Sequence, residues 1–276
     1  MAVAPSPTTV PHPRRGVGIG HTRIPLGAYY AILLLFLYLP ISLLFLFSIN
    51  AGSVLSFPLR GLTLDWYGRL LEADAVLAAA RNSLIVAIAS STAATILGTM
   101  VALLALRYRF VTQRMLIAAA ILPLIVPFVV LAVALLILFR ALDVPLSLLT
   151  VALAHTIVGL PFTLLIVMAR LNGFDRSLEE AAMDLGASYP EALLRIVAPI
   201  IAPALVSAWL TAFTVSFDEF ALALFLAGTQ PTFPVYLFSQ LRFANRLPVM
   251  IALAVLMMVG TLVLIVVAEQ IRRRRP

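Results

Sequence analysis

Two acidic residues, Asp218 and Glu219, stand together inside a strongly apolar stretch at 199–226. A carboxylate within such a stretch is costly to bury unless it faces water or a partner group. At the 100° per residue of a helix, one face of the stretch carries polar side chains within about 60° of one another. These are Ser207, Thr211, Thr214 and Asp218, which we name the polar line. Carboxylate and hydroxyl oxygens can replace part of a solute's hydration, so the polar line predicts a path for a small solute.

Two interpretations stay open at this acidic pair. Glu219 is turned about 100° from Asp218 on the same helix, so we keep it as a second path candidate beside the polar line. Asp218 could instead form a structural ion pair with an arginine of a neighbouring helix. The aromatic side chains lie roughly opposite the polar line, where we expect contacts with lipid or with other helices; they are Trp209, Phe213, Phe217 and Phe220.

A second informative segment, residues 170–199, is longer than a tight connection between two helices needs. Ser177 and Glu180 are spaced as in a capping box, which predicts a helix start. Gly186 predicts the end of that helix, because glycine readily adopts the conformation required just past a helix C-terminus. A second short helix is predicted over 189–197, and Leu178, Ala181, Ala182 and Leu185 share one face of the first. An ordinary interfacial hairpin is the alternative to a partner-binding segment.

The whole chain is far more apolar than a soluble protein. Of its 276 residues, 63% are hydrophobic and 11% are charged, whereas soluble domains are about half apolar and a quarter charged. A membrane-spanning helix needs about 20 apolar residues. Six runs meet this need, at 26–48, 84–106, 115–139, 146–169, 199–226 and 249–268. The sequence therefore predicts an all-α, polytopic membrane bundle of six transmembrane helices and excludes a soluble enzyme.

The basic residues predict the orientation of the bundle. All 19 are arginine, and with both tails placed inside, 13 of them fall on the inner side. Positive charge is enriched on the cytoplasmic side of membrane proteins, so we predict an N-in, C-in topology. Arginines spread over short loops and tails also suit a membrane protein better than a nucleic-acid-binding one. Residues 1–25 are expected to form a flexible cytoplasmic tail and residues 269–276 a basic cytoplasmic tail.

Several spans carry residues that favour close packing or bending. The third contains Pro123 and Pro127, each of which removes a backbone hydrogen bond. His155 in the fourth is expected to hydrogen-bond another helix rather than bind a ligand. In the second, small side chains recur at i, i+4 spacing and would let a neighbouring helix approach closely; they are Ala87, Ser91, Thr95 and Thr99.

The outer segment 50–80 has a pattern typical of a short amphipathic helix at the membrane surface. Trp66 and Tyr67 lie within it, and aromatic rings with a polar atom favour the interface between lipid and water. We therefore expect these two residues to act as interfacial anchors rather than as ligand contacts.

The segment 170–199 carries a recognisable motif. It reads Glu180-Ala181-Ala182, then Gly186 after three residues, then Ile196-Val197-Ala198-Pro199 after nine more. This resembles the hallmark of the membrane permease subunits of bacterial ABC importers, which is E-A-A, three residues, G, nine residues, I-x-L-P. The one departure is Ala198, where the family usually has leucine. Stretches at 170–175, 182–188 and 213–220 are similar to the spermidine/putrescine-type branch of that family.

The resemblance implies a type I importer permease domain over 26–268, in the bacterial inner membrane. Within it, the loop 170–198 would be the coupling loop, whose helix sits in a groove of a cytoplasmic ATPase. The ATPase-coupling residues would be Glu180, Ala181, Ala182, Asp184 and Gly186. Two ATPase subunits, a second and homologous permease, a periplasmic solute-binding protein and membrane lipid are the implied partners, and nucleic acid is not. ATP binding would close the ATPase pair and turn the permease from inward-facing to outward-facing.

The chain's own composition agrees with such a dependent role. A P-loop needs a lysine to reach nucleotide phosphates, and this chain contains no lysine. We therefore expect no cofactor of its own, with ATP bound by the partner ATPase subunits. The chain also lacks cysteine, so no thiolate metal site or cysteine nucleophile is predicted.

The resemblance also implies a class of solute, and the sequence disfavours two other kinds of membrane protein. The branch implies a polyamine or a similar small cationic compound, and permeases for opines, amino-acid derivatives and ferric iron share parts of the pattern. An intramembrane enzyme is disfavoured because the sequence contains neither H-E-x-x-H nor G-x-S-x-G. A channel is disfavoured because nothing in the sequence resembles a ring of filter residues. We predict neither catalytic nor metal-binding residues.

Overall fold

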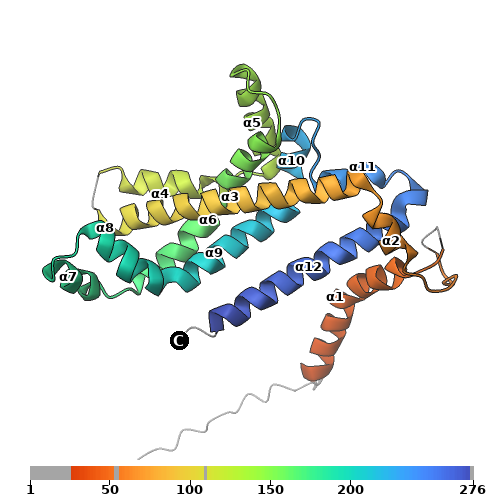
Figure 1. The fold of residues 1–276 in the computed structure, drawn as a ribbon, viewed down its shortest axis with the longest axis horizontal. Helices are drawn as coiled ribbons and strands as arrows, with labels where there is room; N and C mark the ends of the chain where they lie inside the picture. Colours follow the sequence, from red (N-terminus) through yellow and green to blue (C-terminus); the bar gives the residue numbers. More distant parts are fainter. Residues whose placement is uncertain (1–25, 53–55, 109–110, 274–276) are drawn as a thin grey trace, which may run out of the picture. The chain divides into compact units, whose positions relative to one another are not determined.

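The computed structural model describes residues 26–52, 56–108 and 111–273. These residues are helical apart from loops and one isolated antiparallel bridge between Asn50 and Leu62, so the all-α prediction is confirmed. In chain order the elements are α1 (Leu26–Ser48), α2 (Asp65–Leu71), α3 (Asp74–Arg107), α4 (Gln113–Ile121), η1 (Leu122–Leu124), α5 (Phe128–Ala141), α6 (Leu148–Asn172), α7 (Ser177–Asp184), α8 (Tyr189–Ala192), η2 (Leu193–Val197), α9 (Ala198–Asp218), α10 (Ala221–Leu226), α11 (Phe233–Gln240), η3 (Ala244–Arg246) and α12 (Leu247–Arg273) (Figure 1).

The chain divides into two compact units, Met1–Leu43 and Leu44–Pro276. The predicted tail at 1–25 lies outside the described residues, as do residues 274–276 of the predicted basic tail. Both segments that the sequence singles out, the polar line and the loop 170–199, belong to the second unit.

Four helices of the described chain are long and apolar enough to cross a membrane: Gly27–Ser48, Asp74–Arg107, Leu148–Asn172 and Tyr189–Asp218. A fifth crossing is formed if the bent pair Gln113–Leu124 and Phe128–Ala141 counts as one span. In α12 the apolar part, Leu247–Val263, is shorter than the other four. The described residues therefore give four or five crossings, and the sixth stays a prediction.

The second unit is built around three helices, α3, α6 and α9, which lie against one another (Figure 1). Small residues lie at several of their contacts, and of the predicted set on α3, Ala87 and Ser91 are fully buried. A side chain on Gly98 would overlap Thr163 of α6, and one on Gly159 of α6 would lie 3.1 Å from the Cβ of Ala94. The Thr163 hydroxyl donates to the backbone oxygen of Ala94 at 2.7 Å. Close backbone approach of this kind is how membrane helices gain packing energy without a hydrophobic driving force.

The third predicted span bends where its two prolines lie. The helices α4 and η1 end before Pro127, which precedes α5, and the two halves meet at 108°. Pro123 lies inside η1. Because proline cannot donate its backbone nitrogen to the preceding turn, the helix breaks where it occurs. The predicted bend is confirmed.

Helix α2, in the segment predicted to lie outside, is held by contacts within the protein itself. The Trp66 indole N–H donates to the backbone oxygen of Asn50 at 2.7 Å, and the Tyr67 hydroxyl donates to the Ser48 hydroxyl at 2.9 Å. Trp66 is buried in a cluster with Val76 and Phe233. The structure does not support Trp66 as an interfacial anchor, because its ring is buried among residues of the same chain rather than exposed.

Candidate functional site

Within the segment 170–199, helix α7 has a start that differs from the prediction. Ser177 does not cap the helix; the residue before it, Arg176, occupies that position without a side-chain cap. Instead, the Asp175 carboxylate accepts the backbone N–H of Ser177 at 3.0 Å. That backbone N–H, and then the Ser177 hydroxyl, hold the pKa of the Asp175 carboxyl below its usual range. The capping box predicted from Ser177 and Glu180 is absent because the helix starts one residue earlier than the motif requires, so that Ser177 lies inside it.

The end of α7 agrees with the prediction. Gly186 has φ +93°, a conformation that residues with a side chain rarely adopt. Its N–H donates to the oxygen of Met183 at 2.9 Å, and the N–H of Ala187 donates to the oxygen of Ala182 at 3.0 Å. This pair of bonds is a Schellman motif, which satisfies the last carbonyls of the helix and reverses the chain. The positive φ of this turn therefore favours glycine at position 186.

The motif residues lie on the surface of the second unit. Glu180, Ala181, Asp184 and Gly186 are exposed and Ala182 is partly exposed. Leu185 is 90% exposed. It lies in a loop outside the apolar spans, so lipid is not expected to cover this apolar side chain. The face predicted to be apolar thus has no partner within the described chain, which is typical of a surface that another protein covers.

The buried acid of α7 is Glu179, which the sequence did not single out. Its side chain forms an ion pair with Arg107, the last residue of α3, and both side chains are nearly covered. Arg176 also donates to the backbone oxygen of Leu106 in the same turn of α3. These contacts hold the loop 170–198 against the end of α3. Helical periodicity places Glu179 about 100° from Glu180, but nothing in the sequence indicates which arginine it meets.

The second predicted short helix, 189–197, is not separate. Helix α8 passes through the π-helical η2 directly into α9, so the chain runs from Tyr189 to Asp218 without a turn. A capping box does occur at its start, where the Ser188 backbone N–H and hydroxyl both donate to the Glu191 carboxylate at 2.9 Å. The last part of the loop, from Tyr189, is thereby continuous with the helix that carries the polar line.

The hydroxyls of the polar line are bonded within α9. Ser207 donates to Pro203, Thr211 to Ser207 and Thr214 to Leu210, each to a backbone oxygen at 2.9 Å. All three side chains are partly exposed. Each oxygen keeps lone pairs free to accept from a solute, since a hydroxyl that donates once can still accept.

The aromatic face of α9 packs on neighbouring helices of the same chain. Trp209, Phe213 and Phe217 stack in a row with ring centroids 5.3 and 5.7 Å apart. The Trp209 indole N–H donates to the Thr92 hydroxyl of α3 at 3.0 Å. Of the two expected environments, neighbouring helices are therefore the main one.

The two acids end in different environments because α9 stops between them. Asp218 is the last residue of the helix, and Glu219 has an extended backbone with φ −74° and ψ 122°. The predicted span 199–226 is thus interrupted here, and the short helix α10 follows.

Asp218 faces a cavity of about 470 Å³ bounded by α9, α11 and α12. Phe217, Phe233, Met257 and Met258 line it beside Asp218, and Thr261 adds a hydroxyl. Among the described residues Asp218 forms no ion pair, so the alternative of a structural arginine partner finds no support there. The α12 side chains at this cavity were missed because an apolar helix gives no sign of what it faces.

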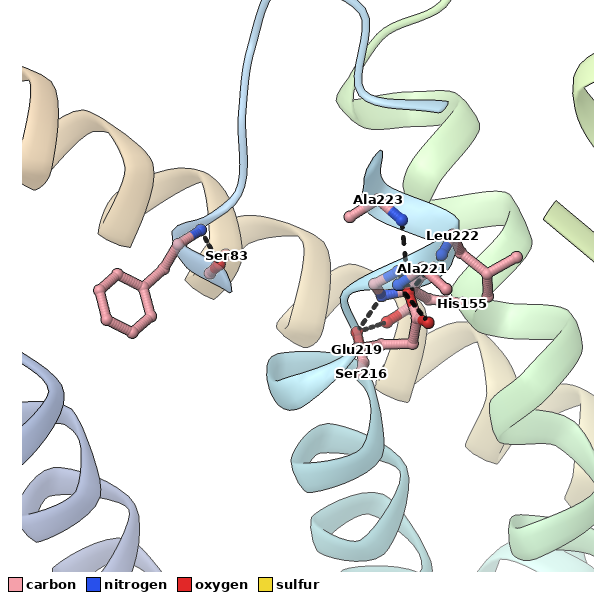
Figure 2. Close-up of polar contacts among 9 residues, drawn as sticks. Ser83, His155, Ser216, Glu219, Ala221, Leu222 and Ala223 are labelled. Atoms are coloured by element: carbon pink, nitrogen blue, oxygen red, sulfur yellow. Dashed lines mark hydrogen bonds and ion pairs between the residues drawn. The ribbon is translucent and has the colours of Figure 1, made fainter. Parts of the chain in front are cut away.

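Glu219 is buried and serves the fold (Figure 2). Its carboxylate accepts the backbone N–H groups of Ala221 and Leu222 at 2.8 Å and of Ala223 at 3.3 Å, which caps α10. His155 Nε2 lies 3.3 Å from the same carboxylate. Glu219 is therefore turned away from the cavity side and into the protein, and its candidacy for the path is weakened by these contacts.

His155 joins the spans as predicted. Its Nδ1 lies 2.8 Å from the Ser216 hydroxyl of α9, which also accepts from the Ser90 hydroxyl of α3 at 2.8 Å. The side chains of α3, α6 and α9 thus meet in one buried polar cluster next to the end of α9 (Figure 2).

Both the segment 170–199 and the polar line lie in a region that matches a known protein family. The family described as binding-protein-dependent transport system inner membrane component matches residues 94–275, which include the segment 170–199 and the polar line. The chain belongs to this family. It is a permease subunit of an ABC import system, located in the inner membrane, and a transport component rather than an enzyme.

Curated relatives of the permease resemble it over most of their length. The spermidine/putrescine transport system permease protein PotC of Haemophilus influenzae is 34% identical, over 90% of this chain and 96% of that protein. The putrescine transport system permease protein PotI of Escherichia coli strain K12 is 37% identical, over 75% of this chain and 76% of that protein.

Solved structures show the same fold at low sequence identity. A chain of a bacterial ABC transporter involved in the import of alginate aligns with a TM-score of 0.73 at 16% identity, over 91% of the permease and 94% of that chain. A chain of the MetNI methionine ABC transporter in an inward-facing conformation aligns with a TM-score of 0.61 at 17% identity, over 72% and 94%.

Proposed function

We propose that the permease forms the path of a small cationic solute, a polyamine or a similar compound. Two observations support this: the relatives named above carry spermidine and putrescine in their names, and Asp218 is exposed in a cavity with no ion-pair partner among the described residues. A carboxylate among aromatic and thioether side chains attracts an ammonium group strongly, because water screens the charge less there. Phe217 and Phe233 add ring faces, which attract cations.

The polar line extends the proposed path below Asp218. Hydroxyl oxygens of Ser207, Thr211 and Thr214 would accept from successive ammonium groups of a polyamine and replace lost hydration. A single free carboxylate keeps binding weak enough for release, which conduction requires.

The proposed assembly contains two ATPase subunits, a second and homologous permease, and a periplasmic solute-binding protein. The ATPase subunits would bind ATP, since the permease has no lysine with which to form a P-loop. Each ATPase would hold a coupling helix through a face like that of α7, where Glu180, Asp184 and Leu185 are exposed. Closure of the ATPase pair on ATP would pull the coupling helices together and open the path outward.

Reconstitution tests this function. The permease, purified with its partner permease and ATPase subunits in proteoliposomes, is expected to take up radiolabelled spermidine or putrescine only with ATP inside and binding protein outside. Uptake of an opine, an amino-acid derivative or ferric iron in place of polyamines would overturn the proposed solute but leave the permease role standing. Solute flux without ATP would point to a channel and would contradict the proposal.

The proposed orientation places both tails in the cytoplasm. This orientation rests on the distribution of the arginines, of which more lie on the predicted cytoplasmic side. Two arginines of that side, Arg107 and Arg176, lie close together where α3 meets α7. The native chain has no cysteine, so a single Pro276→Cys change gives one labelling site. An impermeant maleimide should not label this cysteine in intact cells and should label it after permeabilisation. Labelling in intact cells would contradict the N-in, C-in topology.

A further inference from the structure

The permease contains a buried ion pair whose two partners come from a span and from the coupling loop. Glu179 of α7 is 2% exposed, although α7 lies in a loop whose other acids are exposed. Arg107 is the last residue of α3, and the side chains of the pair are 11% and 3% exposed. Charged side chains are rarely buried in this way unless they are paired. A single buried charge without a partner loses its hydration and destabilises the fold strongly.

Further contacts surround this pair on both sides. The guanidinium of Arg107 lies over the ring of Phe174, 5.9 Å from its centroid, and Arg176 donates to the backbone oxygen of Leu106. Phe174 and Arg176 belong to the connection that leads into α7. The coupling loop is thus bonded to the last turn of α3 through both a charge pair and a backbone contact.

Helix α3 connects this end of the permease with the wall of the Asp218 cavity. In its first half, the Ser83 hydroxyl accepts the backbone N–H of Phe233 at 2.8 Å (Figure 2). The neighbouring Asn82 side chain donates to the oxygen of Pro231 at 3.1 Å. Phe233 lines the cavity. From Ser83 to Arg107 the helix is uninterrupted and spans about 36 Å at 1.5 Å per residue. A displacement at Arg107 would therefore reach Phe233 through one rigid element.

We propose that Arg107 and Glu179 are positioning residues that transmit movement of the coupling helix to α3, and through α3 to the cavity wall. The inference rests on the proposed ATPase coupling. It deepens that proposal by assigning different roles to the neighbouring residues Glu179 and Glu180. Glu180 is exposed and faces the ATPase, whereas Glu179 faces inward and joins α7 to the spans. Without the pair, the coupling helix would move with the ATPase while α3 stays behind.

The test measures coupling rather than activity alone. Arg107→Gln and Glu179→Gln keep side-chain size and remove one charge each. In proteoliposomes with the partner subunits, binding protein and spermidine, each variant should lower the spermidine imported per ATP hydrolysed by about fivefold or more, the lower range of typical coupling strengths. Arg195→Gln is the matched control, because Arg195 is on the same loop with a side chain that is 80% exposed in a loose pair; its ratio should equal that of the wild type.

The charge-exchanged double variant Arg107→Glu/Glu179→Arg separates pairing from other effects. It should recover at least part of the import ratio that the single variants lose. The single variants could instead lower only the yield of intact complex, while the recovered complex imports as much spermidine per ATP as the wild type. That result would show that the pair is merely structural and would overturn the inference. If the single variants do not assemble, failure of the double variant to restore coupled complex overturns it as well. Wild-type complex that neither assembles with the ATPase nor imports spermidine would contradict the proposed function itself, before any variant is measured.

Discussion

Replacing Gly186 with valine should uncouple the permease from its ATPase without unfolding the spans. Gly186 has φ +93°, and a β-branched residue forced into that region costs about 1–3 kcal/mol. A Cβ added there would meet no atom within 4 Å, so we attribute the effect to the backbone conformation. The turn that ends α7 would open, and the exposed face of α7 would be misplaced against its partner. We expect ATP-driven uptake to fall about tenfold or more at normal permease levels, measured in proteoliposomes.

Two variants control for this prediction. Gly186→Asn should retain most uptake, because asparagine tolerates positive φ far better than valine. Gly173→Val makes the same substitution in the same loop at φ −93°, where the added Cβ meets its nearest atom at an ordinary 3.8 Å. It should leave uptake close to that of the wild type. Wild-type uptake and ATPase stimulation in the Gly186→Val complex would show that this turn does not serve coupling.

Asp218→Asn should slow uptake of a cationic solute while the complex assembles normally. The change preserves size and removes the charge that faces the cavity. A carboxylate and an ammonium about 4 Å apart attract each other by about 4 kcal/mol near a protein surface. Because solvation of the ammonium offsets part of this, we expect a reduction of about tenfold or more in spermidine uptake. Proteoliposome uptake and the amount of intact complex are measured together.

The matched control is Asp143→Asn. Asp143 is an exposed acid with φ 53°, a conformation that asparagine tolerates, and it does not line the cavity. It should transport at the wild-type rate. A loss of complex with Asp218→Asn would support a structural role, and unchanged uptake of a confirmed cationic solute would remove Asp218 from the path. A neutral or anionic native solute would remove the charge argument and leave the permease assignment standing.

Features that depend on local pattern and composition could be predicted from the amino-acid sequence. The apolar runs give helices, because in a membrane every backbone group must be bonded within the chain. Pro123 and Pro127 predicted the break between η1 and α5, and Gly186 predicted the turn after α7; both follow from backbone geometry. The motif around Glu180 predicted the family, which the match over residues 94–275 confirmed.

What the tertiary structure decided is which groups meet. Asp218 and Glu219 are neighbours in sequence, but the end of α9 between them sends one to the cavity and the other to the N-terminus of α10. Glu179 and Glu180 differ in the same way, since only the position of α3 decides that Glu179 is buried against Arg107. Periodicity states which residues share a face of a helix. It does not state what that face contacts, because the contact depends on how distant segments pack.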